Sequence, residues 1–170
     1  MSSQSPLLRS EHPGDRQQVR KLNQAAFQRS DEADLIDGLR AEGAVLLSLV
    51  AELDGQIIGH ILFSRMTIET TQNSVAAASL APMAVLPDHQ GRGVGSRLIQ
   101  RGLAELRERG EQIVIVLGHK DYYPRFGFTS ENARHLESPF PPDVYMALEL
   151  FEGALANIRG RVKYPAAFGL

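Results

Sequence analysis

The segment Gln90-Gly91-Arg92-Gly93-Val94-Gly95 has a composition and a position that suit it to binding an anion. The apolar run from Leu80 to Leu86 predicts a buried strand before it, and the apolar spacing between Leu98 and Leu106 predicts an amphipathic helix after it. Glycines let backbone N–H groups converge on a ligand, and a helix N-terminus adds partial positive charge. The segment therefore predicts a binding loop for a diphosphate.

The glycine spacing separates this loop from two other phosphate-binding loops. A dinucleotide-binding loop reads G-x-G-x-x-G and a P-loop ends in Gly-Lys-Ser or Gly-Lys-Thr, and neither pattern is present. The pattern Gln-x-x-Gly-x-Gly between a strand and a helix resembles the coenzyme A loop of the GNAT superfamily of N-acetyltransferases. For this segment taken alone, a tight turn with flexible glycines is the alternative.

A second motif follows the loop. Residues Gln112 to Leu117 predict another buried strand, and Tyr123 then stands four residues before Gly127 in the order Tyr-Pro-Arg-Phe-Gly-Phe. This order resembles the Tyr-x-x-x-Gly-Phe signature of the same superfamily, and the interval from the loop accommodates one helix and one strand. From the two ordered motifs, the chain is identified as a member of the GNAT superfamily.

The expected elements are a strand, two helices, three strands, a helix, a strand, a short helix and further strands from Gly127, which predicts an α+β fold with a mixed sheet. Asp54-Gly55 predicts a hairpin turn between the strands Ala44 to Leu53 and Gln56 to Met66. Over about Leu7 to Leu150, the resemblance implies a mostly antiparallel sheet flanked by helices and splayed between the fourth strand (Ser74 to Leu86) and the fifth. We expect residues 1–170 to form a single N-acetyltransferase domain. Residues 151–170 are a C-terminal extension in which Val162 and Tyr164 predict an added strand.

The resemblance assigns coenzyme A to the glycine loop and to the strand before it. The amides of Gly91 to Ser96 are expected to face the pyrophosphate, and Arg92 either adds charge to a phosphate or is simply solvated. The Val85 N–H is the candidate for polarising the acetyl carbonyl. The expected cofactor-binding residues are Met83, Ala84, Val85, Gln90, Gly91, Arg92, Gly93, Val94, Gly95 and Ser96.

Tyr123 is the candidate general acid that the resemblance implies. A phenol has a pKa of about 10 against about 8.5 for a thiol, so it can protonate or hydrogen-bond a departing thiolate near neutral pH. The alternative is a tyrosine that only packs the short helix against the core, and the adjacent Tyr122 is a competitor for the same role.

The general base is less well defined. Some relatives carry a glutamate on the fourth strand, where this chain has Ser79, and many carry an asparagine where this chain has the segment Gly118 to Asp121. His119, at the end of the fifth strand, is the expected catalytic base, and ordered water is an equal alternative. The other candidates have structural or solvated interpretations; they are Glu52, His60 and Glu69.

Composition excludes several classes of protein. With 18 Lys and Arg against 20 Asp and Glu, the net charge of −2 gives no electrostatic footprint for nucleic acid. The chain has no cysteine, which excludes disulfides, a cysteine-based metal site and an acetyl-carrying thiol, and we expect no metal. No apolar run reaches the roughly 20 residues that span a bilayer, and residues 1–9 lack the apolar region of a signal peptide, so a cytoplasmic protein without a membrane partner is expected.

The sequence therefore predicts an acetyl-CoA-dependent N-acetyltransferase that acts on a primary amine of a small molecule or protein by direct attack. A non-catalytic acyl-CoA-binding or sensor domain of the same fold is the alternative, and a nucleotide-binding regulatory module is a more distant one. The acceptor is not defined by any motif. A homodimer formed through the C-terminal strands rests on analogy with the fold alone.

Overall fold

A long hairpin joins strand β3 (Gln56–Glu69) to strand β4 (Ser74–Val85) through the polar turn at residues 70–73. In the computed structural model, which describes residues 4–170, this hairpin contributes to two compact units. Within the described residues, unit 1 comprises residues 4–63 and Ala81–Gly102, and unit 2 comprises Ser64–Leu80 and Leu103–Leu170. The expectation of no signal peptide rests partly on residues 1–3, which lie outside the described residues.

Unit 1 contains the N-terminal elements and the start of the third helix. Its elements are β1 (Leu7–Ser10), η1 (Pro13–Asp15), α1 (Arg16–Phe27), α2 (Asp31–Ala41), β2 (Val45–Leu53), the first part of β3, the end of β4, η2 (Pro87–His89) and the first turns of α3 (Val94–Glu108). Strand β1 pairs antiparallel with β2, from Leu7↔Glu52 to Ser10↔Leu49.

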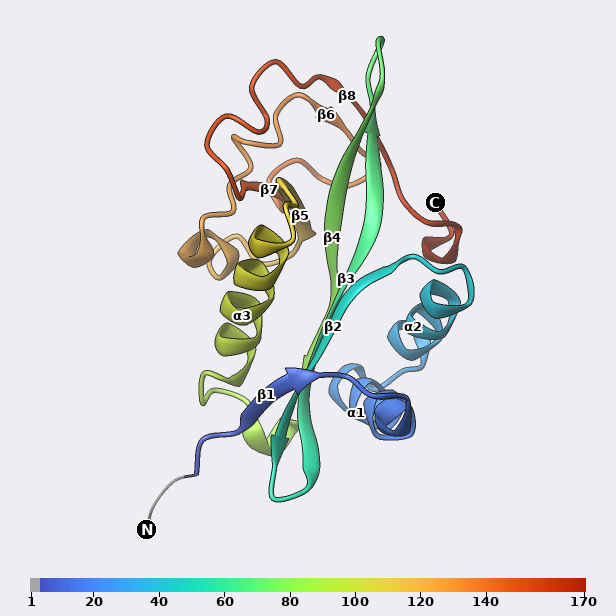
Figure 1. The fold of residues 1–170 in the computed structure, drawn as a ribbon, viewed down its shortest axis with the longest axis vertical. Coiled ribbons are helices and arrows are strands. Elements are labelled where there is room, and N and C mark those ends of the chain that lie inside the picture. The colour runs from blue at the N-terminus through green and yellow to red at the C-terminus, as the bar shows by residue number, and fades with distance from the viewer. Residues whose placement is uncertain (1–3) are drawn as a thin grey trace. The chain divides into compact units, whose positions relative to one another are not determined.

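Local sequence signals account for most of unit 1. Asp54 and Gly55 both have positive φ angles, of 50° and 78°, as the two central residues of a type I′ hairpin turn require. Helices α1 and α2 bury apolar residues at helical spacing, namely Val19 and Leu22 on α1 and Ala33, Ile36 and Leu39 on α2. Figure 1 shows these two helices side by side on the same side of β2.

Unit 2 contains the remaining strands. Its elements are the outer part of the β3–β4 hairpin, the end of α3, β5 (Ile113–Leu117), η3 (Tyr123–Phe126), β6 (Leu136–Glu137), β7 (Tyr145–Glu149), β8 (Gly160–Lys163) and η4 (Ala166–Phe168). Strand β5 pairs antiparallel with β7, while β8 pairs antiparallel with β3 and parallel with β6. Strand β8 lies within the C-terminal extension.

The pairing between β4 and β5 is parallel and short. The described ladder holds two residue pairs, Ala78↔Val114 and Ser79↔Ile115, although β4 continues to Val85 and β5 to Leu117. Because the ladder ends early, it agrees with the expected divergence of β4 from β5. The α+β fold, with a mixed and mostly antiparallel sheet flanked by helices, is confirmed.

The strand expected from Gly127 onward does not form as a regular strand. The segment contributes an isolated bridge, Thr129↔Ala147, and then turns. The Thr129 hydroxyl accepts the Asn132 N–H at 3.0 Å, and the Ala133 N–H donates to the Ser130 carbonyl at 3.1 Å. These local bonds satisfy backbone groups that a strand would have paired across the sheet, so the segment forms turns.

Candidate functional site

The glycine loop begins at the end of β4 and leads into α3 within unit 1. Gly91 and Gly93 have φ angles of 75° and 82°, in the left-handed region that favours glycine, and an added Cβ would meet no atom within 4 Å at either position. The Arg97 N–H donates to the Gly93 carbonyl at 3.1 Å, so the helical hydrogen bonds start there. The N–H groups of Val94 and Gly95 therefore belong to the first turn, where an α-helix provides no acceptor of its own.

A close contact with the sheet fixes the position of this helix start. An ideal Cβ on Gly59 of β3 would lie 2.9 Å from Val94 Cγ1 and 3.1 Å from Leu98 Cδ1, both below normal carbon–carbon contact distances. Gly102 likewise leaves room for the Phe63 ring, 2.4 Å from an ideal Cβ. Glycine at these positions lets α3 lie directly against β3. Neither Gly59 nor Gly102 stands in a sequence pattern that predicts this role.

Gln90 connects the loop to the preceding strand. Its side-chain Nε2 donates to the Val85 carbonyl at 2.9 Å. The Leu86 N–H donates to the Ile58 carbonyl of β3 at 2.9 Å. Because backbone groups of successive strand residues point to opposite edges, those of Val85 and Met83 lie on the edge of β4 away from β3. Ala84 is buried and its backbone groups lie on the β3 edge.

Arg92 lies in the glycine loop, and Pro82 lies on the strand before it. Arg92 is exposed and forms no ion pair with any residue in the described range 4–170. The Ala81–Pro82 peptide bond is cis, and Pro82 is buried. Unit 1 therefore brings together a glycine loop, an exposed guanidinium and a strand edge with backbone groups, which are the features expected of a site for an extended ligand with a diphosphate.

Tyr123 lies in unit 2, at the start of the short helix η3. Its N–H and that of Tyr122 both donate to the His119 carbonyl, at 3.2 and 3.1 Å. The Tyr123 ring is enclosed by edge-to-face contacts with Tyr122 and Phe128, at centroid distances of 5.2 and 5.8 Å. An ideal Cβ on Gly118 would lie only 2.3 Å from Tyr123 Cε2, so the ring occupies the space that a side chain at 118 would fill.

The hydroxyl of Tyr123 is less enclosed than its ring. The residue is 8% exposed, and its hydroxyl has no hydrogen-bond partner among the described residues 4–170. The hydroxyl oxygen is nevertheless absent from the fully buried polar atoms that lack a partner. It therefore reaches the surface. Burial of the ring and the neighbouring Tyr122 raise the pKa of Tyr123 to about 12. The phenol is protonated at neutral pH and is a stronger candidate for hydrogen-bond donation than for complete proton release.

The four candidate bases have different surroundings. Glu52 accepts a hydrogen bond from Arg9 at 2.8 Å, and Glu69 accepts from Ser74 and Thr67 near the hairpin turn, so both have local partners. His119 is exposed beyond the end of β5, and its ring has no hydrogen-bond partner within the described residues. It is the candidate with an available imidazole.

His60, the fourth candidate, is fully buried in unit 1. Its Nε2 lies 2.9 Å from Ser48 Oγ and 3.7 Å from Glu11 Oε2, and Arg40 donates to the same Glu11 carboxylate. Burial lowers the pKa of His60 and favours the neutral ring. This burial and these contacts agree with the interpretation of His60 as a structural histidine, which stays a prediction.

Residues 4–170 contain no group of three or more His, Cys, Asp or Glu side chains that could hold a metal ion. Within the same residues, no helix is long and apolar enough to cross a membrane.

Comparison with protein families decides the class of the protein. Residues 8–130 match the acetyltransferase (GNAT) domain family. The chain belongs to the GNAT acetyltransferase family. YjhQ of Escherichia coli strain K12, named as an uncharacterized N-acetyltransferase, is 40% identical over 147 residues, which cover 84% of this chain and 81% of YjhQ. YhbS of the same strain, also named as an uncharacterized N-acetyltransferase, is 32% identical over 165 residues, which cover 95% of this chain and 98% of YhbS.

Solved structures of related proteins agree with this assignment. The GNAT-family YhbS from Escherichia coli, solved in complex with CoA, superposes with a TM-score of 0.90 at 31% identity, covering 100% of this chain and 95% of YhbS. A GNAT-family acetyltransferase from Brucella melitensis, in complex with acetyl-CoA, gives a TM-score of 0.79 at 36% identity, covering 96% and 97%. The predicted superfamily and enzyme class, N-acetyltransferase, are confirmed. The roles of individual residues stay predictions.

Proposed function

We propose that the protein transfers the acetyl group of acetyl-CoA to a primary amine of a small molecule or protein by direct attack of the amine on the thioester. The observation that carries this proposal is the loop at residues 91–96, where two glycines with left-handed φ angles precede the N-terminus of α3. The loop follows β4, whose Met83 and Val85 backbone groups lie on the edge away from β3. The complexes of YhbS with CoA and of the Brucella melitensis protein with acetyl-CoA support the same ligand for this chain.

In this proposal the loop and β4 bind coenzyme A. The amides of residues 91–96 bind the pyrophosphate, and Arg92 adds a positive charge. The pantetheine arm pairs with Met83 and Val85 in the manner of an added strand. The Val85 carbonyl accepts a hydrogen bond from Gln90, and the Val85 N–H is the donor proposed to polarise the acetyl carbonyl. A preorganised donor of this kind contributes roughly 3 to 4 kcal/mol to catalysis.

The chemistry needs only a proton acceptor and a donor to the leaving group. The amine nitrogen lone pair attacks the carbonyl carbon and forms the C–N bond, and collapse of the tetrahedral intermediate breaks the C–S bond. The amine loses one proton, to His119 or to water, and the thiolate gains one. Tyr123 donates a hydrogen bond to the thiolate as it departs. Since its pKa is about 12 against about 8.5 for a thiol, complete transfer of the phenol proton is uphill, and solvent supplies the final proton.

The composition supports a direct transfer. The chain contains no cysteine, so no thiol of the protein carries the acetyl group between donor and acceptor. The remaining parts of the proposal are sequence predictions, namely the cytoplasmic location, the homodimer, and the absence of nucleic-acid, membrane and metal partners.

A non-catalytic acyl-CoA-binding domain is the second candidate. Ser79 favours it, because this residue stands where some relatives carry a catalytic glutamate, and it is 4% exposed within the β4–β5 ladder. The exposed imidazole of His119 and the hydroxyl of Tyr123 favour the enzyme.

A turnover assay separates the two candidates. Purified protein is incubated with acetyl-CoA and a panel of amines that includes polyamines, aminoglycosides, free amino acids and peptides with a free N-terminus or lysine. Release of free thiol and the acetylated product are measured together. The proposal expects acceptor-dependent release that Gly93→Asp abolishes. Tight binding of acetyl-CoA with no release above the rate of hydrolysis for any acceptor class favours the binding domain.

A further inference from the structure

A cleft of about 520 Å³ lies in unit 2, and none of the residues assigned to acetyl transfer lines it. The segment that precedes β6 and the segment between β7 and β8 form its walls. The lining residues are Asn132, Arg134, His135, Glu149, Gly153, Leu155, Ala156, Asn157, Ile158 and Arg159. The volume falls within the range of small-molecule sites, roughly 300 to 1,000 Å³.

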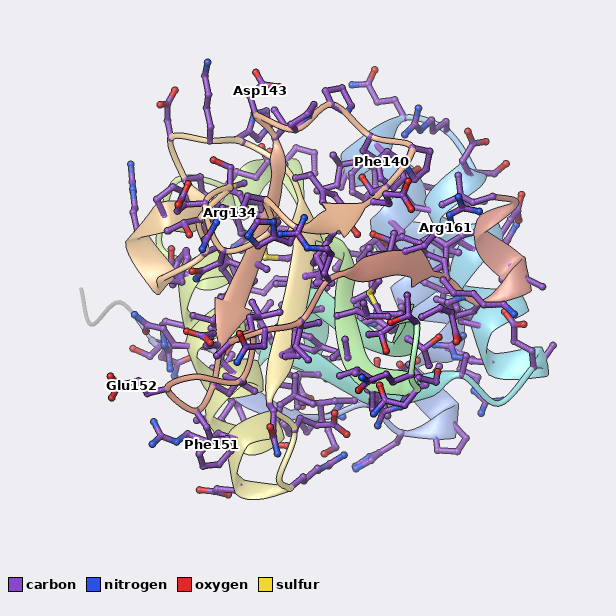
Figure 2. The ribbon with its side chains drawn as sticks, turned by 90° about the horizontal axis from the view of Figure 1, so that it is seen from above. Arg134, Phe140, Asp143, Phe151, Glu152 and Arg161 are labelled. Atoms are coloured by element: carbon purple, nitrogen blue, oxygen red, sulfur yellow. The ribbon has the colours of Figure 1, made fainter. Side chains whose placement is uncertain are left out.

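The parallel pairing of β6 with β8 brings cationic side chains together at this cleft. Leu136 pairs with Gly160, and the Gly160 N–H donates to the His135 carbonyl at 3.2 Å, which places His135 beside Arg159. Arg134 precedes His135 on the same segment. Figure 2 shows Arg134 on the segment before β6 and Arg161 on β8.

The charges at this cleft are incompletely balanced. Arg159 forms no ion pair with any residue in the described range, and Arg134 has an exposed ion pair with Glu131 at 3.3 Å. Two residues further along, Arg161 lies opposite Glu137 in the β6–β8 ladder and forms an ion pair with it at 3.5 Å, whereas Arg159 precedes the ladder and has no carboxylate partner among the described residues. Like charges placed on neighbouring strands are unfavourable, and a bound anion removes this repulsion.

The pKa of His135 is lowered by partial desolvation and by the positive charges of Arg159 and Arg134, while the charge of Glu131 raises it. Glu149 is the acidic residue of the cleft lining, and its Oε2 accepts the Leu155 N–H at 2.7 Å. Its charge opposes an anion and limits the affinity.

We propose that this cleft is a second ligand site, which binds a phosphate group through Arg134, His135 and Arg159. Guanidinium groups match phosphate oxygens in geometry, and two such groups favour a dianion over a monoanion. The phosphate is either inorganic phosphate or the phosphate of a small phosphomonoester. The proposal does not depend on the acetyl-transfer function.

The test is a titration followed by amide NMR on the full chain without CoA, in which shifts at the glycine loop, residues 91–96, are followed separately from shifts at the cleft. Inorganic phosphate and O-phosphoserine are titrated in separate arms at constant ionic strength, with acetate as the monoanion control. We expect saturable shifts at residues 132–135 and 157–159 in at least one phosphate arm, and much weaker shifts with acetate. The arm with the tighter binding identifies the source of the phosphate.

Variants make the assignment specific. Arg159→Gln should weaken phosphate binding by at least about tenfold, because it removes a charged hydrogen-bond donor. Arg161→Gln is the matched control, since Arg161 is paired with Glu137, and it should change the binding by less than about twofold. Glu149→Gln should tighten binding. Absence of saturable shifts in both arms, or an equal loss in the Arg159 and Arg161 variants, would overturn the proposal.

Discussion

Replacing Gly118 by alanine should disable Tyr123 without touching the coenzyme A loop. An ideal Cβ at position 118 would lie 2.3 Å from Cε2, 2.7 Å from Cδ2 and 3.3 Å from Cζ of the Tyr123 ring. Carbon atoms in contact are about 3.5 Å apart, so the ring must move by about 1 Å. Gly118 does not have a positive φ angle, so alanine adds no backbone strain and the effect is one of space.

Two magnitudes follow from this displacement. Overpacking of a core contact destabilises a fold by about 1 to 3 kcal/mol, which for a chain of this length lowers Tm by roughly 2 to 12 °C. A misplacement of about 1 Å at a catalytic group lowers the rate by about 10²-fold. We therefore expect Gly118→Ala to lower kcat by about that factor while the Kd of acetyl-CoA changes little.

The assay measures thiol release with a good acceptor, acetyl-CoA affinity and a melting curve for each variant. Gly14→Ala is the control, because an added Cβ there meets no atom within 4 Å and Gly14 has no positive φ angle. In a Tyr123→Phe background, Gly118→Ala should slow the reaction little further, since both changes act on the same group. Wild-type kcat and Tm in Gly118→Ala, or fully additive losses in the double variant, would refute this reasoning.

Three further predictions concern separate parts of the molecule. Gly93→Asp should abolish acetyl-CoA binding, because it places a carboxylate beside the expected pyrophosphate, while Tm changes by only a few degrees; unchanged affinity in a binding titration would contradict the loop assignment. If His119 is the base, His119→Ala should remove the acidic limb of the pH–rate profile, and survival of that limb in the variant would exclude it. Arg9 holds the pKa of Asp15 at about 2, so this group contributes about 2 kcal/mol of stability that is present above about pH 4 and is lost as the pH falls to about 2. Asp15→Asn should flatten the acid unfolding curve in this range, and an unchanged pH dependence would show that the ion pair is not responsible.

The features that were predicted from sequence depend on local signals. The turn at Asp54-Gly55 needs two positive φ angles, which those two residue types tolerate, and the structure has them. The glycine loop was predicted because its motif is contiguous and lies between an apolar run and an amphipathic helix. The strand β3 extends to Glu69, three residues beyond the expected end at Met66, because Ile68 and Glu69 pair with β8, a contact that is distant in sequence.

The features that were missed depend on contacts between distant residues. Gly59 and Gly118 each make room for a side chain that approaches from another element, and no pattern around either glycine indicates this. The network of Glu11, Ser48 and His60 joins strands β2 and β3 to the segment that follows β1, so sequence spacing does not predict it. The parallel pairing of β6 with β8 was not predicted either, because β6 has only two residues and shows no strand pattern in the sequence.

The most direct test of the proposed chemistry compares kcat and acetyl-CoA affinity in Tyr123→Phe and Tyr122→Phe. Both substitutions keep an aromatic ring and remove one hydroxyl. The proposed role of Tyr123 predicts a fall in kcat of about 10²-fold for Tyr123→Phe, with acetyl-CoA Kd within about twofold of wild type and Tyr122→Phe close to wild type in both. Wild-type turnover in Tyr123→Phe, or a loss confined to Tyr122→Phe, would contradict it.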